Sequence, residues 1–272
     1  MARALNSNEM HEVSVNSWEE FEQQLKELRC REGDSASRLL FRGQEQSSWS
    51  LATTLERNDK AEMSFGQYYG FISKVRPQIE CFTGNVWTIP EYPEVEALVK
   101  EFDEFSLGLS SGRMPAYSYM VHLRHHGFPS PLLDWSRSPY VAAYFAFSKA
   151  DDKSDGKVAI YVFSEAAFKL GGNRMPFIHR FGPYVKTHRR HFLQQSEYTI
   201  CFFFDTQWRF EQYDKVFSSN RQQQGNLWKF IIPSAQRLKV LKLFDEYNLN
   251  AHSLFDSEET LMETLALRVL HF

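Results

Sequence analysis

The sequence predicts an α+β fold. Segments with apolar residues at helical spacing alternate irregularly with short apolar runs typical of strands, unlike the regular alternation of a βαβ protein. The chain has 272 residues, of which 43% are hydrophobic, and this is ample material for a large core. We find no internal repeat or linker. We therefore expect one domain over 1–272, with an N-terminal helical segment over 1–37 and a helical insertion over 58–114.

Helices are predicted from caps and from apolar spacing. Ser17 and Glu20 form a capping box in front of apolar residues that recur at helical spacing. Ser138 has the position of an N-cap, and Pro139 follows it at the first helical position. The predicted helices span 17–30, 61–80, 94–109, 115–127, 139–149 and 234–247, and a last helix begins near residue 256.

Strands are predicted where aliphatic and aromatic residues form short runs without helical spacing. The first run ends at Gly43, and the third follows Glu197. The predicted strands span 38–43, 157–163, 198–204 and 227–232.

Charge and cysteine content narrow the class of protein. The chain has 31 basic and 34 acidic residues, and this net charge of −3 excludes a generally basic nucleic-acid coat. Its three cysteines lie far apart, which favours a reducing compartment and argues against a disulfide framework. The N-terminus has no apolar signal region, and the longest apolar run, 140–147, is too short to span a membrane. We expect a cytoplasmic protein with no membrane partner.

Two idiosyncratic segments carry a family resemblance. The first is Phe41-Arg42-Gly43-Gln44, and the second runs from His125 to Pro139 and contains Leu132-Leu133-Asp134-Trp135-Ser136. Over about 38–150 the chain resembles the FRG-domain family of bacterial toxin and anti-phage loci. It departs from the usual pattern at Pro131, where an arginine more often stands. The resemblance implies a toxin, with an antitoxin protein and a chaperone as its partners.

A second, looser resemblance concerns chemistry. Arg42-Gly43, Ser136-Arg137-Ser138 and Gln195-Ser196-Glu197 follow one another as the motifs of the arginine–serine–glutamate class of ADP-ribosyltransferases do. The chain is similar to that class in the order of these motifs and in the elements that carry them. The resemblance implies a split mixed β-sheet of the ADP-ribosyltransferase type, with N-terminal and inserted helices. It also implies NAD as the co-substrate, with no metal.

The resemblance implies the catalytic residues. Cleavage of the nicotinamide–ribose bond passes through an oxocarbenium-like state, which a carboxylate on a rigid strand stabilises. We assign this role to Glu197. Gln195 stands two residues earlier and is expected on the same strand face, where it would orient the acceptor. Arg42 would position NAD, and Glu258 is a reserve catalytic acid.

The same resemblance implies the residues that hold NAD. Arg42 offers a planar cation for the pyrophosphate, and Gly43 would let the backbone approach the nicotinamide amide. Ser136 would bond the ribose or the glutamate. Tyr140 and Tyr144 are candidates to stack on the nicotinamide.

One stretch of the chain favours nucleic acid as the acceptor. Residues 166–196 contain six basic residues, several aromatic rings and no Asp or Glu. Cations interleaved with flat rings suit the phosphates and bases of a single strand. A solvated loop that balances acidic segments is the structural alternative. The basic residues are Lys169, Arg174, Arg180, Lys186, Arg189 and Arg190, and we assign substrate binding to the last four of them.

The candidate site residues also have structural alternatives that the sequence leaves open. Arg42 would pair with a core carboxylate such as Asp134, and Ser138 would serve as a helix cap. Ser136 and Glu197 are compatible with ordinary packing. Adjacent histidines at 125 and 126 diverge on a helix and are poor joint metal ligands.

The leading functional hypothesis is an NAD-dependent mono-ADP-ribosyltransferase toxin that modifies single-stranded RNA. The alternatives are ADP-ribosylation of a protein, hydrolysis of NAD, and RNA binding without catalysis. No P-loop or Rossmann glycine pattern supports a kinase or a dehydrogenase.

Overall fold

The computed structural model describes residues 10–33, 38–60, 62–150, 155–165, 175–217 and 225–272. The strands are β1 (His11–Ser14), β2 (Leu40–Gln44), β3 (Leu133–Ser136), β4 (Lys157–Glu165), β5 (Phe177–Phe181), β6 (Ser196–Phe204), β7 (Trp208–Phe210) and β8 (Gly225–Pro233). The helices are α1 (Trp18–Glu32), α2 (Phe65–Thr83), α3 (Tyr92–Leu98), α4 (Phe102–Ser110), α5 (Tyr117–His125), α6 (Pro139–Phe147), α7 (Arg190–Leu193), α9 (Arg237–Glu246), α10 (Ala251–Phe255) and α11 (Glu258–His271). Short 3-10 turns lie at Glu56–Asn58 (η2) and Ser234–Gln236 (η3).

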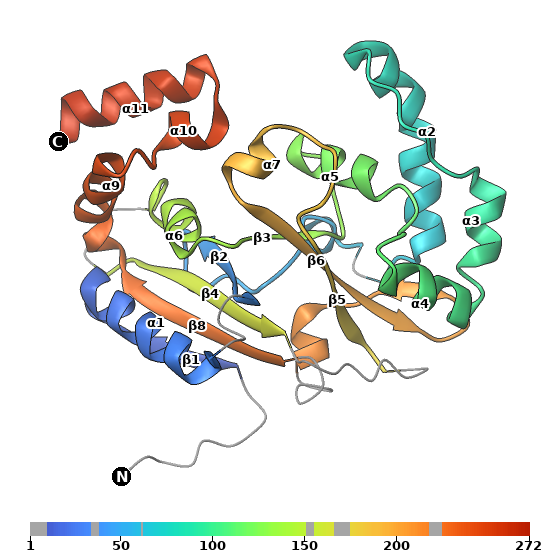
Figure 1. Cartoon of the computed structure of the whole chain (residues 1–272), viewed down its shortest axis with the longest axis horizontal. Helices are drawn as coiled ribbons and strands as arrows, with labels where there is room; N and C mark the ends of the chain where they lie inside the picture. The colour runs from blue at the N-terminus through green and yellow to red at the C-terminus, as the bar shows by residue number, and fades with distance from the viewer. Residues whose placement is uncertain (1–9, 34–37, 61, 151–154, 166–174, 218–224) are drawn as a thin grey trace, which may run out of the picture.

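Eight of the described strands form one open sheet (Figure 1). Its order is β1-β8-β4-β2-β3-β6-β5, and β7 pairs with β6. The β1–β8 pair is parallel and the other pairs are antiparallel. The prediction of a mixed sheet with surrounding helices is therefore confirmed. The expectation for 1–37 was incomplete, because its described part contributes the edge strand β1 as well as α1.

Most predicted helices form, with ends shifted by a few residues. The helix predicted over 94–109 is wrong in one respect, because it is divided into α3 and α4. Val99 lies at the break, is buried, and accepts a hydrogen bond at its carbonyl from the Trp208 amide at 3.2 Å. A continuous helix would use that carbonyl within itself, so the strand contact and the helix compete for one acceptor.

The helices cover the two halves of the sheet separately. Helices α1, α6 and α9 pack on β2, β4 and β8, with Phe41, Ile160 and Phe230 in this core. The helices of the predicted 58–114 insertion, together with α5, pack on β5, β6 and β7. None of the helices described is both long and apolar enough to cross a membrane.

The middle of the sheet is forked. Within the described strands one residue pair, Phe41 opposite Ser136, joins β2 to β3. Beyond that pair β2 continues along β4 and β3 continues along β6. Each of the two strands is therefore paired along its length only with its other neighbour, β4 for β2 and β6 for β3. The two strands are not paired with each other at the end where Gln44 and Leu133 lie.

Candidate functional site

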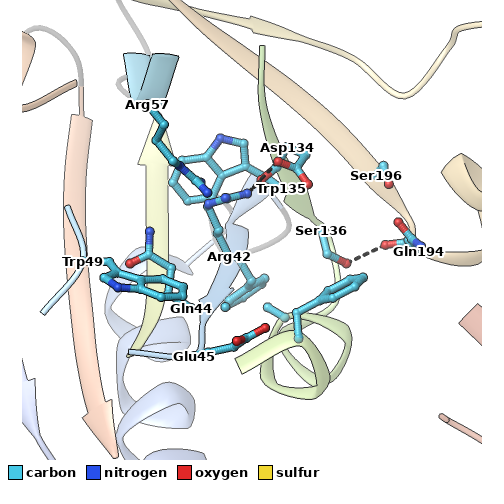
Figure 2. Close-up of a pocket in the computed structure, with 14 residues that line it drawn as sticks. Arg42, Gln44, Glu45, Trp49, Arg57, Asp134, Trp135, Ser136, Gln194 and Ser196 are labelled. Atoms are coloured by element: carbon cyan, nitrogen blue, oxygen red, sulfur yellow. Dashed lines mark hydrogen bonds and ion pairs between the residues drawn. The ribbon is translucent and has the colours of Figure 1, made fainter. Parts of the chain in front are cut away.

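A pocket of about 210 Å³ occupies the fork between β2 and β3 (Figure 2). Because successive side chains of a strand point to opposite faces, the fork gathers side chains from both faces of the sheet. Its walls come from β2 and the turn after it, from β3, from α6, and from the segment that enters β6. The polar side chains of this pocket are Arg42, Gln44, Glu45, Arg57, Asp134, Ser136, Gln194 and Ser196.

Asp134 is the carboxylate that pairs with two arginines at the pocket. Its Oδ1 is 2.6 Å from Nη1 of Arg42 and 2.7 Å from Nη2 of Arg124, and Arg42 also donates to the Asp134 carbonyl at 2.8 Å. Burial alone would raise the pKa of the Asp134 carboxyl, but the charges of Arg124 and Arg42 outweigh burial and hold that pKa well below its usual range. The pairing of Arg42 with Asp134 that the sequence left open is confirmed.

Arg57 adds a third guanidinium to this cluster. It lies within the turn η2 and points toward Arg42 across the pocket (Figure 2). It donates to the Ala52 carbonyl at 3.2 Å, and no carboxylate among the described residues lies within ion-pair distance of it. Burial lowers the pKa of Arg57, and the nearby charges of Arg42 and Arg124 lower it further, whereas Asp134 and Glu56 act in the opposite direction. The pocket therefore has an excess of positive charge on this side, which favours an anionic ligand.

The aromatic rings of the pocket are not those that the sequence predicts. The structure does not bring Tyr140 and Tyr144 into this pocket. Tyr140 packs against Trp18 and Phe244, and Tyr144 lines a separate cavity beside α11. Each residue turns a helix by about 100°, and α6 is oriented with Phe145 rather than these tyrosines toward the fork.

Trp49 and Phe145 provide the flat surfaces instead. Both line the pocket, and Trp49 is 43% exposed. Neither was assigned from the sequence. Trp49 stands in the turn after β2, and the only signal for Phe145 was its spacing of three residues from Ala142 on α6.

Close packing of α6 on β2 explains why a glycine stands at position 43, and this reason differs from the one that the sequence predicts. A β-carbon at this position would overlap the Ala142 carbonyl oxygen and lie 2.7 Å from the backbone nitrogen of Ala146. Helix α6 thus crosses β2 directly over Gly43. Gly43 also lines the pocket, and α6 covers the side of β2 toward which a β-carbon would point.

Ser136 and Ser138 connect β3 to its neighbours. The Ser136 hydroxyl donates to the Gln194 carbonyl at 2.8 Å (Figure 2). It also accepts from the Ser138 amide at 3.0 Å. Ser138 accepts from the Val141 amide at 3.3 Å, which confirms the predicted N-cap of α6. Ser136 lines the pocket, and its hydroxyl also fixes the segment that enters β6.

Glu197 lies outside the pocket, contrary to prediction. Its side chain is 3% exposed and accepts a hydrogen bond from Nε of Arg180 at 2.7 Å, with Nε of Arg137 at 3.8 Å. Ser196 lines the pocket, whereas Glu197 lies on the other face of β6, where Arg180 holds its carboxylate. Arg180, which we assigned to substrate binding, is half-buried, pairs with Glu197 and Glu165, and donates to the Arg38 carbonyl.

Gln195 does not share a strand face with Glu197. It lies before the first residue of β6, is exposed, and has a φ of 50°. Its carbonyl accepts from the Arg137 amide at 3.0 Å. Glu258, the reserve acid, is exposed at the start of α11 and does not line the pocket either.

The remaining predicted cations lie on the surface beside the pocket. Lys186 is exposed, whereas Arg189 pairs with Asp256 and Arg190 stacks on Phe255 at 5.4 Å. Lys169 and Arg174 lie outside the described residues. Among the described residues no cluster of three or more His, Cys, Asp or Glu side chains has the arrangement of a metal site.

A family model matches the part of the chain that forms most of this site. Residues 37–155 match the family described as the FRG domain. The chain carries an FRG domain. The FRG match runs from just before β2 to just beyond α6, so it includes Arg42, Arg57 and Asp134, whereas Gln194 and Ser196 lie outside it. No curated protein and no solved structure matches the chain.

Proposed function

We propose that the pocket of the FRG domain binds NAD and that the protein is a mono-ADP-ribosyltransferase acting on single-stranded RNA. The observation that carries the proposal is the position of Arg57. A guanidinium without a carboxylate partner faces the Arg42–Asp134 pair, and the flat rings of Trp49 and Phe145 stand in the same pocket. Cations suit a pyrophosphate, and rings suit the nicotinamide or adenine.

The size of the pocket limits how NAD would bind. A volume of about 210 Å³ is below the range of pockets that enclose a whole drug-sized ligand. Only part of the dinucleotide would be enclosed, and the rest would extend into solvent. This arrangement leaves one side of the reacting ribose open to a large acceptor.

The transfer step needs a carboxylate near the ribose. The bond between ribose C1′ and the nicotinamide nitrogen breaks, and its electron pair leaves with nicotinamide. A lone pair of the acceptor then forms the new bond to C1′, and the acceptor's proton passes to a base or to water. Glu45 lines the pocket, and no described cation is within ion-pair distance of it. Because the Oδ1 of Asp134 is engaged by two arginines, we assign stabilisation of the ribosyl cation to Glu45.

The surface beside the pocket supports RNA as the acceptor. Tyr184 is 96% exposed, Phe192 is 61% exposed, and the exposed Lys186 lies between them in the chain. The segment then continues into Gln194 and Ser196 at the edge of the pocket. Modification of cellular RNA would be harmful, so our proposal includes a toxin role restrained by an antitoxin. The exposed Val269 and Leu270 of α11 suit such a partner.

We expect Arg57→Ala to weaken NAD binding by about 10- to 100-fold, because a charge-assisted contact with phosphate is worth about 1.5–3 kcal/mol. Isothermal titration with NAD and with ADP-ribose measures the change. Arg113→Ala removes an exposed arginine outside the pocket and serves as the matched control. Equal affinities of the two variants would exclude Arg57 from the nucleotide site.

We expect Glu45→Gln to retain NAD affinity and to lower transfer by about 100-fold, as loss of one electrostatic contact to a transition state does. The assay uses NAD labelled on its adenylate phosphate and offers total RNA, single-stranded DNA and cell protein separately. Glu246→Gln changes an exposed acid on α9 and is the control.

The distribution of label decides the acceptor. Label retained on RNA supports the proposal. Label retained on protein would mean that the acceptor is a protein, and the assignment of the NAD site would remain. Consumption of NAD without label indicates a hydrolase. If the protein is folded and NAD is not consumed, the remaining interpretation is a module that binds RNA without catalysis.

A further inference from the structure

A second cavity lies between the C-terminal part of α2 and the C-terminal end of α5. We name it the α2–α5 groove. It has a volume of about 510 Å³, and no charged side chain lines it among the described residues. Phe82 forms one wall and is 92% exposed, and Phe128 and Pro129 form part of the other. A free aromatic ring at the edge of a hollow is costly in water unless a ligand covers it.

The groove uses residues of the second FRG-like segment that the pocket in the fork does not use. That segment runs from His125 to Pro139, and Asp134, Trp135 and Ser136 serve the pocket. Its beginning, from His126 to Pro129, lines the groove instead. The two ends of one segment therefore serve two separate cavities.

A row of rings connects the groove to the basic surface. Trp87 contacts His122 with ring centroids 4.6 Å apart, and His122 contacts His126 at 4.3 Å. His126 then contacts His188 at 5.6 Å. His188 belongs to the stretch that carries Lys186 and Arg189 and leads to the pocket in the fork. The groove is thus continuous with the surface that we assign to RNA.

Arg190 is the charged side chain that acts on two of these three histidines, while the nearby carboxylates have other partners: Glu80 accepts from the Trp87 amide, and Asp256 pairs with Arg189. Burial lowers the pKa of His126 and of His188, and the charge of Arg190 lowers both further. Burial and the other two histidines lower the pKa of His122 to about 4. No described carboxylate contributes to these three shifts. At neutral pH the histidines are therefore uncharged flat rings beside a cation, and such a surface favours an anionic, planar partner over an apolar peptide.

We propose that the α2–α5 groove binds unpaired bases of a single-stranded nucleic acid whose phosphates contact Lys186 and Arg190. Bases stack on Phe82 and on the histidine rings, and the strand continues past Tyr184 and Phe192 to the pocket in the fork. This inference deepens the proposed RNA acceptor, on which it rests. It also places the bound strand at two positions on the surface, so a short oligonucleotide would bind more weakly than one long enough to reach both.

The test measures RNA binding without NAD, so that it is independent of catalysis. The full chain is titrated against a fluorescent 12-nucleotide single-stranded RNA of mixed sequence, and anisotropy gives the dissociation constant. We expect Phe82→Ala to weaken binding by about 5- to 100-fold, because stacking of one base on an aromatic ring contributes in this range. His126→Ala is expected to weaken binding in the same direction.

Val86→Ala is the matched control, since Val86 is 82% exposed, lies four residues from Phe82 and does not line the groove. The large exposure of Phe82 means that its replacement leaves folding intact, and a melting curve checks this. Affinity of Phe82→Ala and His126→Ala equal to that of Val86→Ala would overturn the groove assignment. Equal binding of a duplex RNA by the unmodified protein would overturn the role of unpaired bases.

The experiment distinguishes an error in the groove assignment from an error in the proposed enzymatic function. NAD binding by the same preparations, measured by titration, reports on Arg57 and the pocket in the fork. Normal NAD binding without any RNA affinity would overturn both the groove and the RNA acceptor, while the NAD site would stand.

Discussion

Gly43→Ala is expected to destabilise the protein by about 3 kcal/mol, at the upper end of the usual cost of overpacking. The added methyl group would overlap the Ala142 carbonyl oxygen and crowd the Ala146 backbone nitrogen. Both neighbours are backbone atoms of α6, so no side-chain rotation can relieve the overlap. The helix has to move away from β2, and the wall that carries Phe145 moves with it.

Thermal unfolding followed by circular dichroism measures this effect. A loss of about 3 kcal/mol lowers the Tm of a chain of this size by about 6–12 °C. Gly108→Ala is the matched control, because a β-carbon there meets only the Arg113 carbonyl, at an ordinary contact distance of 3.7 Å. A Tm of Gly43→Ala equal to that of the control would mean that β2 and α6 are not packed as described.

Glu197→Gln is expected to lower stability by about 3 kcal/mol, at the lower end of the range for a broken buried ion pair, because Arg180 loses the carboxylate 2.7 Å away and keeps Glu165 at 4.0 Å. Arg180 is 15% exposed and Glu197 is 3% exposed, so solvent compensates little for the lost partner. The catalytic assignment predicts something different, namely full stability with loss of transfer. Urea unfolding and the labelled-NAD assay on the same preparation separate these two outcomes.

A double variant distinguishes the structural role of Glu197 from the catalytic one. Replacing both residues, as Glu197→Gln with Arg180→Met, also removes the cation that has lost its nearest carboxylate, and we expect much of the lost stability to return. Recovered stability together with normal transfer would establish the ion pair as structural. Recovered stability with transfer still absent would return Glu197 to the catalytic machinery.

Local signals in the sequence predicted the elements and the family. Ser138 caps α6 as expected, because an N-cap depends on contacts within one turn. The Phe41-Arg42-Gly43 segment and the segment around Asp134 were identified as the FRG-like parts, and the family match covers both. Arg42 and Ser136 were also expected at the site, and both line the pocket.

The orientation of side chains could not be predicted in the same way. The face that β6 presents depends on where the strand starts, and a difference of one residue turns Glu197 from the pocket to the buried side. The rotation of α6 about its axis depends on the contact at Gly43, which excludes Tyr140 and Tyr144 from the pocket. Arg57 reaches the site because hydrogen bonds between Thr54, Leu55 and Ser130 fix its turn to the segment before β3. Each of these facts is set by contacts between segments far apart in the chain.

The single residue pair between β2 and β3 leaves the stiffness of the sheet to its apolar cores. On one face each half of the sheet has its own core. On the other face a third core, which contains Leu40, Trp135, Ile178 and Leu227, joins strands of both halves across the fork. The walls of the pocket are therefore held in place before any ligand arrives, so a bound nucleotide would lose little free energy to ordering its site.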